Sequence, residues 1–356
     1  MKKHIQLLAL FMAISMVLTA CGSAAPAPAP APGSTPSSET APAPAAKQRY
    51  AILFKSAGNP YGEKMMEGFK NEVEALGHEA ITKAPDQPTA EAQIQMVEEL
   101  IAQKVDAIYL AANDADALQP VLEKAMKAGI KVFTGDSGVN PAGRMVHVNQ
   151  ADTQKIGETL VEAAFDMTGG SGEFAVLSAT SQATNQNAWI AVMQETLKQD
   201  KYKDLKLVKV AYGDDVRDKS VSETEALLKS YPNLKCIVAP TTVGIAAAGK
   251  VLTDKGLKDK VALTGLGLPS EMAEYIENGV CKYMYLWNPI DLGYLGAHTA
   301  VALVEGKITG KEGDKFSAGR LGDYTITKAG DGGTEVLMGP PFKFDAANIK
   351  EWKTVY

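Results

Sequence analysis

Polar side chains follow the short apolar runs of this sequence, at the positions where buried strands would end. Lys55 follows one run and Asp136 follows another, so the set holds one charge of each sign. The other positions, mostly amides and hydroxyls, are Asn113, Asn149-Gln150, Asn185-Gln186, Thr241-Thr242, Leu266 and Trp287-Asn288. Each residue taken alone is as typical of a turn or a helix cap as of a ligand-binding site. Together they can match the donors and acceptors of a small polyhydroxylated molecule bound beyond the carboxyl ends of parallel strands.

Patterns typical of catalysis or of metal binding are weak in this chain. No Gly-x-Ser-x-Gly motif occurs, and His78, His147 and His298 are scattered, without carboxylates or cysteines at metal-ligand spacing. Segment 244–251 fits seven positions of a phosphate-binding loop, but Val251 stands where a Ser or Thr must bind magnesium. We therefore expect no catalytic residue, no cofactor and no metal, and a binding protein rather than an enzyme.

The composition indicates a folded chain of two domains. It has 356 residues, of which 46% are hydrophobic and 22% charged, and domains hold roughly 150 residues each. A formal net charge of −6 and a pI near 5.4 argue against nucleic acid as the main partner. Three cysteines are too few for a disulfide scaffold, and Cys236 and Cys281 are expected as buried free thiols, with a disulfide between them as the alternative.

The N-terminus has the plan of a secretory signal peptide. Lys2 and Lys3 precede an apolar run over residues 5–18, which is too short to span a membrane. The run ends in Leu-Thr-Ala-Cys, which resembles the bacterial lipobox and implies that Cys21 is lipidated and becomes the new N-terminus. The alternative is an ordinary signal peptide with a chance cysteine. We expect a signal peptide over 1–20.

A tether follows the predicted lipidation site. Residues 22–47 read GSAAPAPAPAPGSTPSSETAPAPAAK and contain no aromatic or large aliphatic side chain that could form a core. Alternating Ala-Pro favours extended polyproline II. Residues 21–47 are therefore expected to hold the folded body away from a membrane surface.

Short apolar runs alternate with helical patterns through the rest of the chain, as buried parallel strands alternate with covering helices. Asn59-Pro60, Thr89 and Asn288-Pro289 are typical helix starts. The strand candidates are 50–54, 79–82, 107–111, 131–134, 145–148, 174–178, 205–211, 236–239, 261–264 and 283–286.

The spacing of these candidates fits successive βαβ units, so we expect an α/β fold with two doubly wound parallel-sheet lobes. A long helix from residue 289 to 305 and short irregular segments follow, too small to form a domain. The chain must therefore cross between the lobes more than once. We expect an N-terminal lobe of 48–150 with 290–324, a C-terminal lobe of 151–289 with 325–356, and a hinge between them.

Several segments make the body resemble the ribose-type (type I) periplasmic binding proteins, the receptors of ABC importers. FKSAGNPYGEKMMEGF, GIKVFTGDS, ATNQNAWI, IVAPTTVGIAAAG and LWNPIDLGY look most like the branch that contains autoinducer-2 receptors and rhamnose-binding proteins. The resemblance covers the body from Tyr50 to the C-terminus. It implies a monomer that closes its two lobes over a small ligand and delivers it to a membrane permease.

The resemblance also assigns site residues. In autoinducer-2 receptors a small tetrahydroxylated furan is held by a lysine, an aspartate, an aspartate-glutamine pair, a proline and an alanine. The matching positions here are Lys55, Asp136, Asn185, Gln186, Pro240 and Thr242. Asn185 and Thr242 depart from that pattern. A charge-assisted hydrogen bond contributes roughly 1.5–3 kcal/mol and a neutral one roughly 0.5–1.5, so Asn185 weakens the contact unless Thr242 adds one.

The expected function is therefore a lipid-anchored receptor on the outer face of the cell membrane, or in a periplasm, that captures autoinducer-2 for an ABC importer. L-rhamnose or another simple sugar is the alternative ligand. A sensory receptor that serves a membrane kinase is the alternative role. Sugar-responsive repressors share the two-lobed body, but they carry a helix-turn-helix where this chain has an export signal.

Overall fold

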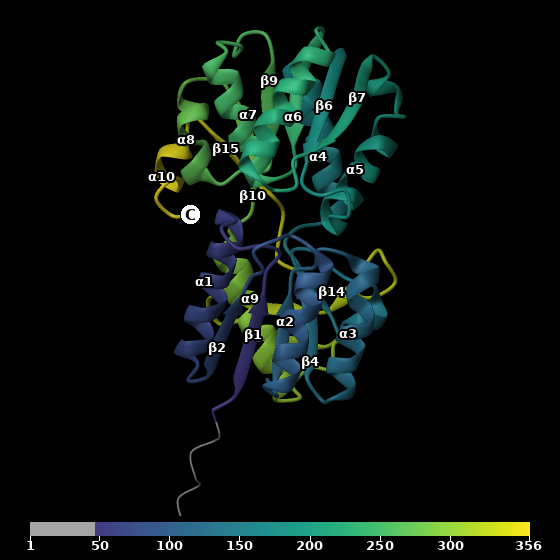
Figure 1. Ribbon diagram of the computed structural model, residues 1–356, viewed down its shortest axis with the longest axis vertical. Coiled ribbons are helices and arrows are strands. Elements are labelled where there is room, and N and C mark those ends of the chain that lie inside the picture. The colour runs from purple at the N-terminus through teal and green to yellow at the C-terminus, as the bar shows by residue number, and fades with distance from the viewer. Residues whose placement is uncertain (1–46) are drawn as a thin grey trace, which may run out of the picture. The chain divides into compact units, whose positions relative to one another are not determined.

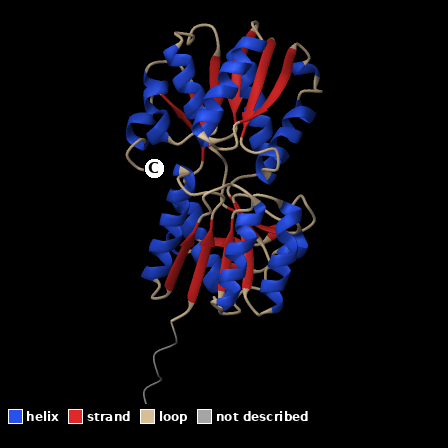
Figure 2. Ribbon diagram, in the orientation of Figure 1, coloured by secondary structure: helices blue, strands red, loops and turns tan. Residues whose placement is uncertain are grey.

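The computed structural model describes residues 47–356, which form two α/β lobes (Figures 1 and 2). The predicted signal peptide, Cys21 and the tether up to residue 46 lie outside the described residues. Each lobe has a mainly parallel sheet with helices against it, which confirms the predicted fold class.

The first lobe is built on a seven-stranded sheet with the order β13-β14-β5-β4-β3-β1-β2. Every neighbouring pair is parallel except β13 and β14. The strands are β1 (Arg49–Leu53), β2 (Glu79–Lys83), β3 (Ala107–Leu110), β4 (Lys131–Gly135), β5 (His147–Asn149), β13 (Thr327–Lys328) and β14 (Thr334–Leu337). A hairpin of β11 (Lys315–Ser317) and β12 (Asp323–Thr325) lies outside this sheet.

The second lobe is built on a four-stranded parallel sheet with the order β7-β6-β8-β9. Isolated bridges join its edge at β9 to the segment of β10, which pairs antiparallel with β15. The strands are β6 (Gly172–Ser178), β7 (Leu205–Tyr212), β8 (Leu234–Ala239), β9 (Ala262–Gly265), β10 (Tyr283–Leu286) and β15 (Phe342–Asp345).

Helices flank both sheets. The first lobe has α1 (Pro60–Ala75), α2 (Ala90–Ala102), α3 (Ala115–Lys127) and α9 (Pro289–Val304). The second has α4 (Thr153–Thr168), α5 (Thr184–Thr196), α6 (Arg217–Ser230), α7 (Thr242–Asp254), α8 (Pro269–Glu277) and α10 (Ile349–Trp352). None of the helices between residues 47 and 356 has the length and apolar character needed to cross a bilayer.

The helix starts predicted from capping residues are confirmed. The side chains of Asn59, Thr89 and Asn288 each accept a hydrogen bond from a backbone N–H of the first turn of α1, α2 and α9. Proline follows Asn59 and Asn288 at the first helical position, where its missing N–H costs nothing. Local sequence therefore sets where these helices begin.

Two glycines allow α9 to pack directly on α1, although the helices are far apart in sequence. A Cβ on Gly68 would lie 2.1 Å from the backbone oxygen of Ile290, and one on Gly293 would lie 2.0 Å from that of Met65. Any larger residue would push the helices apart. This packing holds α9, which follows a second-lobe strand, on the first lobe.

The chain crosses between the lobes three times, at 150–152, 287–288 and 338–341. The strand pairing places one segment of the chain in a different lobe from the predicted one. Residues 325–337 were expected with the second lobe, but β14 pairs in parallel with β5 of the first sheet. Val336 is fully buried there, which explains why this short segment stays with the first lobe.

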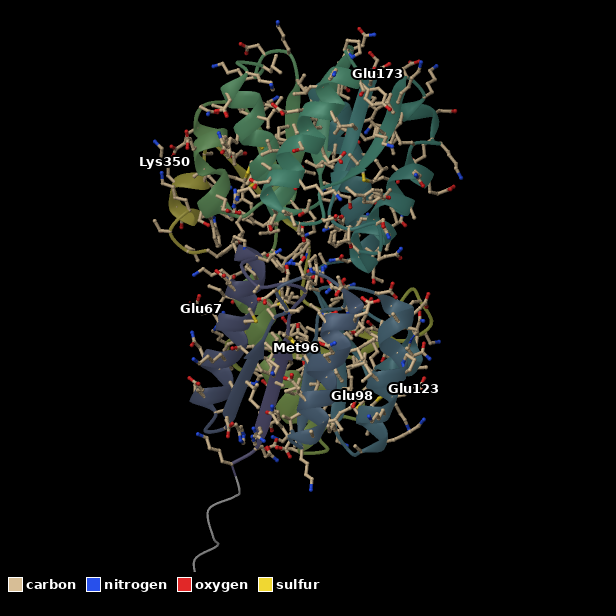
Figure 3. All side chains as sticks on the ribbon, in the orientation of Figure 1. Glu67, Met96, Glu98, Glu123, Glu173 and Lys350 are labelled. Atoms are coloured by element: carbon tan, nitrogen blue, oxygen red, sulfur yellow. The ribbon has the colours of Figure 1, made fainter. Side chains whose placement is uncertain are left out.

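Outer helix faces carry charge, and the interior carries the apolar side chains. Glu67 on α1, Glu98 on α2 and Glu123 on α3 are labelled on the first lobe in Figure 3, and each forms an ion pair with a lysine. Cys236 and Cys281 are buried free thiols, and burial raises the pKa of the Cys236 thiol to about 12. These thiols are structural side chains of the second lobe.

Candidate ligand-binding site

A cavity lies between the lobes, and all six predicted ligand-binding residues line it. The first lobe contributes Lys55 and Asp136, and the second contributes the others, which are Asn185, Gln186, Pro240 and Thr242. Polar side chains of both lobes therefore meet at one cavity, as in a ligand site between two lobes.

Lys55 and Asp136 form a buried ion pair at the cavity wall. Nζ of Lys55 lies 2.7 Å from Oδ2 of Asp136, and the two side chains are 10% and 5% exposed. Removing either partner of such a pair leaves an uncompensated buried charge, which is strongly unfavourable. The pair presents both a cationic donor and an anionic acceptor to a bound molecule.

A buried glutamine holds the strand ends that carry Lys55. Gln93 of α2 is fully buried, and its Nε2 donates hydrogen bonds to the backbone oxygens of Phe54 at 3.1 Å and Ala111 at 2.8 Å. Its Oε1 accepts from the backbone N–H of Asn113 at 2.8 Å, and Nδ2 of Asn113 donates to the backbone oxygen of Lys55 at 2.9 Å. Asn113 thus positions Lys55 and does not line the cavity.

Asp136 has an unusual backbone conformation just after β4. Its φ is +60°, in the left-handed region that only a small share of non-glycine residues adopt. Nε2 of Gln150 donates to its backbone oxygen at 3.1 Å. Strained backbone of this kind clusters at binding sites, where the surrounding contacts enforce it. Gln150 therefore helps to position Asp136.

Asn185 and Gln186 lie in the first turn of α5, and their side-chain oxygens are already engaged. Oδ1 of Asn185 accepts from the backbone N–H of Gln186 at 2.9 Å and, across the cleft, from Ser137 at 3.4 Å and Lys55 at 3.5 Å. Oε1 of Gln186 accepts from Ser178 and from the backbone N–H of Ala179, both at 2.7 Å. The NH₂ groups of both amides are thereby available as donors.

A second carboxylate, which the sequence analysis missed, lines the same cavity. Asp215 follows β7 with a φ of +53°, and burial raises the pKa of its carboxyl group. The hydroxyl of Thr241 donates a hydrogen bond to Asp215 instead of capping α7. The signal for this residue in the sequence is its position, because Asp214-Asp215 follows the predicted strand 205–211.

Aromatic and aliphatic side chains form the remaining wall. Trp189 of α5 and Trp287 at the second crossing meet edge to face, with ring centroids 5.9 Å apart. Leu266 and Leu286 line the same cavity. Burial, together with the nearby charge of Asp136, holds the pKa of Tyr61 well above its usual value. The cavity thus combines hydrogen-bonding groups with an apolar surface, as sugar rings require.

The other predicted positions have structural roles instead. Asn288 caps α9, and Nδ2 of Asn149 donates to Glu335 of β14 at 2.8 Å. The segment 244–251, which resembles part of a phosphate-binding loop, lies within α7. Among residues 47–356 no group of three or more His, Cys, Asp or Glu side chains is arranged to hold a metal ion.

Comparison with known proteins identifies the family. A family model described as a periplasmic binding protein domain matches residues 50–308. An ABC transporter solute binding protein from Clostridium phytofermentas, solved with bound L-rhamnose, is 51% identical, covers 87% of this chain and 99% of its own, and superposes with a TM-score of 0.86.

Two further solved structures are similar. A sugar ABC transporter from Actinomyces odontolyticus is 39% identical, covering 86% of this chain and 97% of its own, with a TM-score of 0.68. LsrB from Clostridium saccharobutylicum in complex with AI-2 is 22% identical, covering 85% of this chain and 99% of its own, with a TM-score of 0.81. At that identity the last likeness concerns the fold alone. The family match and the two-lobed fold show that this chain belongs to the periplasmic binding protein family, a family of solute-binding proteins.

Proposed function

We propose that this protein captures L-rhamnose in the cleft between its lobes and delivers it to the permease of an ABC importer. Its class is that of a sugar-binding protein of an ABC transporter, in line with its family and its relatives. The identity of the ligand is the proposal. The relative solved with L-rhamnose is 51% identical over nearly the whole body, which supports this choice.

The observation that carries the proposal is the mixed wall of the cavity. Lys55, the amides of Asn185 and Gln186, and two aspartates supply donors and acceptors for ring hydroxyls. Leu266, Leu286 and two tryptophans supply an apolar surface. A 6-deoxyhexose such as L-rhamnose has both features, since it carries hydroxyls around the ring and a methyl group in place of one hydroxymethyl.

Autoinducer-2 is the second candidate, supported by Lys55, Asp136, Gln186 and Pro240, which match the residue types of autoinducer-2 receptors. We place it after L-rhamnose, which reverses the order expected from the sequence. Asn185 and Thr242 depart from the receptor pattern, and the additional carboxylate of Asp215 lines the cavity. The relative in complex with AI-2 is only 22% identical.

Lobe closure is the expected mode of binding. Asn185 of the second lobe accepts hydrogen bonds from Lys55 and Ser137 of the first, so the two lobes already meet at the cavity. A ligand that contacts residues of both lobes favours the closed arrangement over an open one, because it makes its full set of contacts only there. Closure then presents one defined surface to the permease.

Calorimetric titration of L-rhamnose and of autoinducer-2 into the purified protein tests the proposal. L-rhamnose is expected to bind in the micromolar range or tighter. Lys55→Ala and Asp136→Ala should each weaken binding about 30-fold or more, because loss of a charged partner in a closed cleft costs roughly 2–5 kcal/mol. Lys64→Ala is a matched control on exposed α1 surface and should bind like wild type.

Two outcomes would contradict this assignment. Tight binding of autoinducer-2 with no heat from L-rhamnose would make the second candidate the ligand. Wild-type affinity in both Lys55→Ala and Asp136→Ala would place the site elsewhere. Deletion of the gene for this protein separates import from sensing, since uptake of the sugar is lost if the protein serves an importer and persists if it is a sensory receptor.

A further inference from the structure

The carboxylate of Asp215 faces the candidate site with one of its oxygens unused. Asp215 lies in the turn between β7 and α6, is half-buried and lines the cavity. Its Oδ1 accepts a hydrogen bond from the hydroxyl of Thr241. Its Oδ2 accepts none from residues 47–356 and is not fully buried. Lys55, a cation of the same cavity, is already paired with Asp136. Oδ2 of Asp215 is therefore accessible to a ligand and has no partner within the lobes.

The backbone of this turn holds the carboxylate in place. Asp214 and Asp215 have φ angles of +54° and +53°, a region that few non-glycine residues adopt. The N–H groups of Gly213 and Asp214 donate to the backbone oxygens of Ser178 and Ala179 at 2.9 Å and 3.1 Å, which fixes the turn on the end of β6. Strained backbone of this kind clusters at binding sites.

Helix capping does not account for this conformation. An aspartate just before a helix commonly accepts a hydrogen bond from an N–H of the first turn. The first turn of α6 receives no such bond from a side chain, and neither does that of α7, where Thr241 stands at the cap position. Asp215 and Thr241 thus bond to each other across two strand ends. Both residues give up a local role and form part of the cavity wall instead.

The other polar groups of the cavity require an acceptor opposite them. Lys55 is a donor, and the side-chain oxygens of Asn185 and Gln186 are already engaged, so these amides offer N–H groups. A sugar hydroxyl that accepts from such donors still has its own hydrogen to donate. Neighbouring hydroxyls of a ring lie close enough for one carboxylate to accept from both. Hydrogen bonds to a charged acceptor are roughly twice as strong as neutral ones.

We propose that Asp215 is a specificity-determining residue whose carboxylate accepts hydrogen bonds from two neighbouring hydroxyls of the sugar. This inference deepens the proposed function and rests on it, since the sugar is taken to be L-rhamnose. The ligand class becomes sugars that carry two adjacent free hydroxyls. L-rhamnose has hydroxyls at C1, C2, C3 and C4, so every adjacent pair includes the hydroxyl at C2 or at C3.

The test uses calorimetry with three probes, which are L-rhamnose, 2-deoxy-L-rhamnose and 3-deoxy-L-rhamnose. Wild type is expected to bind at least one deoxy sugar about tenfold or more weakly than L-rhamnose. Asp215→Asn keeps the shape of the side chain, and asparagine tolerates the same backbone conformation. This variant should bind L-rhamnose about tenfold more weakly than wild type does. In it the loss caused by the missing hydroxyl should shrink to about threefold or less, because a neutral acceptor replaces a charged one.

Asp214→Asn is the matched control, because Asp214 has the same backbone conformation, pairs with Lys219 and does not line the cavity. It should bind all three sugars as wild type does. A purely structural role of Asp215 would weaken all three sugars by the same factor, which would overturn the inference and leave the proposed function intact. Equal affinity of wild type for the three sugars would overturn it in the same way. Failure of wild type to bind L-rhamnose would refute both proposals.

Discussion

The indole Nε1 of Trp287 donates a hydrogen bond of 2.6 Å to the hydroxyl of Tyr61. Trp287 lies at the second crossing between the lobes, and Tyr61 lies in the first turn of α1 in the first lobe. Both side chains line the candidate site. This contact therefore links the position of the crossing segment to the wall of the cavity.

Tyr61→Phe should weaken L-rhamnose binding about five- to twentyfold. The substitution keeps the ring but leaves the buried indole N–H without an acceptor, at a cost of roughly 1–3 kcal/mol. Calorimetric titration measures the change in affinity. Tyr294→Phe serves as the control, because that hydroxyl accepts a hydrogen bond from Arg320 outside the cavity. Equal losses in both variants would show that the Trp287 contact has no special role in binding.

Gln93→Met should destabilise the protein by about 3 kcal/mol and also weaken ligand binding. The amide of Gln93 satisfies three backbone groups at the ends of β1 and β3, and a thioether can replace none of these hydrogen bonds. Denaturant unfolding measures the free energy of unfolding. Gln95→Met, on the exposed face of α2, should be nearly neutral. A similar effect of the two substitutions would argue against the role of Gln93 in holding the backbone next to Lys55.

Acid should destabilise the protein partly through His147. Burial and the charge of Arg144 lower its folded pKa from 6.5 to about 3. The unfolded chain then binds a proton below pH 6.5 that the folded chain does not, so this contribution to stability is present above pH 6.5 and is lost as the pH falls. The loss reaches up to about 2 kcal/mol by pH 5.

The His147→Gln variant isolates that effect, because glutamine does not titrate. The difference in unfolding free energy between wild type and the variant should shift in favour of the variant as the pH falls from 7 to 5. Chemical denaturation at several pH values gives this difference directly. A difference that stays constant over that range would mean that folding does not shift the pKa of His147.

The pair Asn185 and Thr242 should govern the choice between the two candidate ligands. Asn185→Asp combined with Thr242→Ala restores the residue types of autoinducer-2 receptors at both positions. The double variant should lose L-rhamnose affinity by about tenfold and bind autoinducer-2 more tightly than wild type. A coupling energy of roughly 0.5–3 kcal/mol between the two sites is expected in a double-mutant cycle. If the two changes in binding free energy simply add, the side chains at positions 185 and 242 do not act together on the bound ligand.

Cys21→Ala should release the protein from the membrane fraction into the soluble fraction. Cys21 is the proposed lipidation site, and it lies outside the folded body of residues 47–356. L-rhamnose affinity of the purified variant should therefore equal that of wild type. Fractionation of the host cells followed by immunoblotting measures the distribution. Retention of the variant in the membrane fraction would rule out the anchor at this cysteine.

The sequence by itself determined the local structure, because the signals for it are local. Asn59, Thr89 and Asn288 mark helix starts through hydrogen bonds within one turn, and short apolar runs mark buried strands through the burial that they require. Residue types after the strand ends also pointed to Lys55, Asp136, Asn185, Gln186 and Thr242, which line one cavity, and the family resemblance added Pro240. These inferences needed no knowledge of which strands are neighbours.

Only the tertiary structure decided which distant residues meet. β14 joins the first sheet because Val336 finds a buried place beside β5, and nothing in its short segment encodes that partner. Asp215 lies at the cavity because β7 ends beside β6, and Thr241 from another strand end satisfies its carboxylate. Such contacts depend on the packing of whole sheets and helices, which residue type and spacing along the chain do not specify.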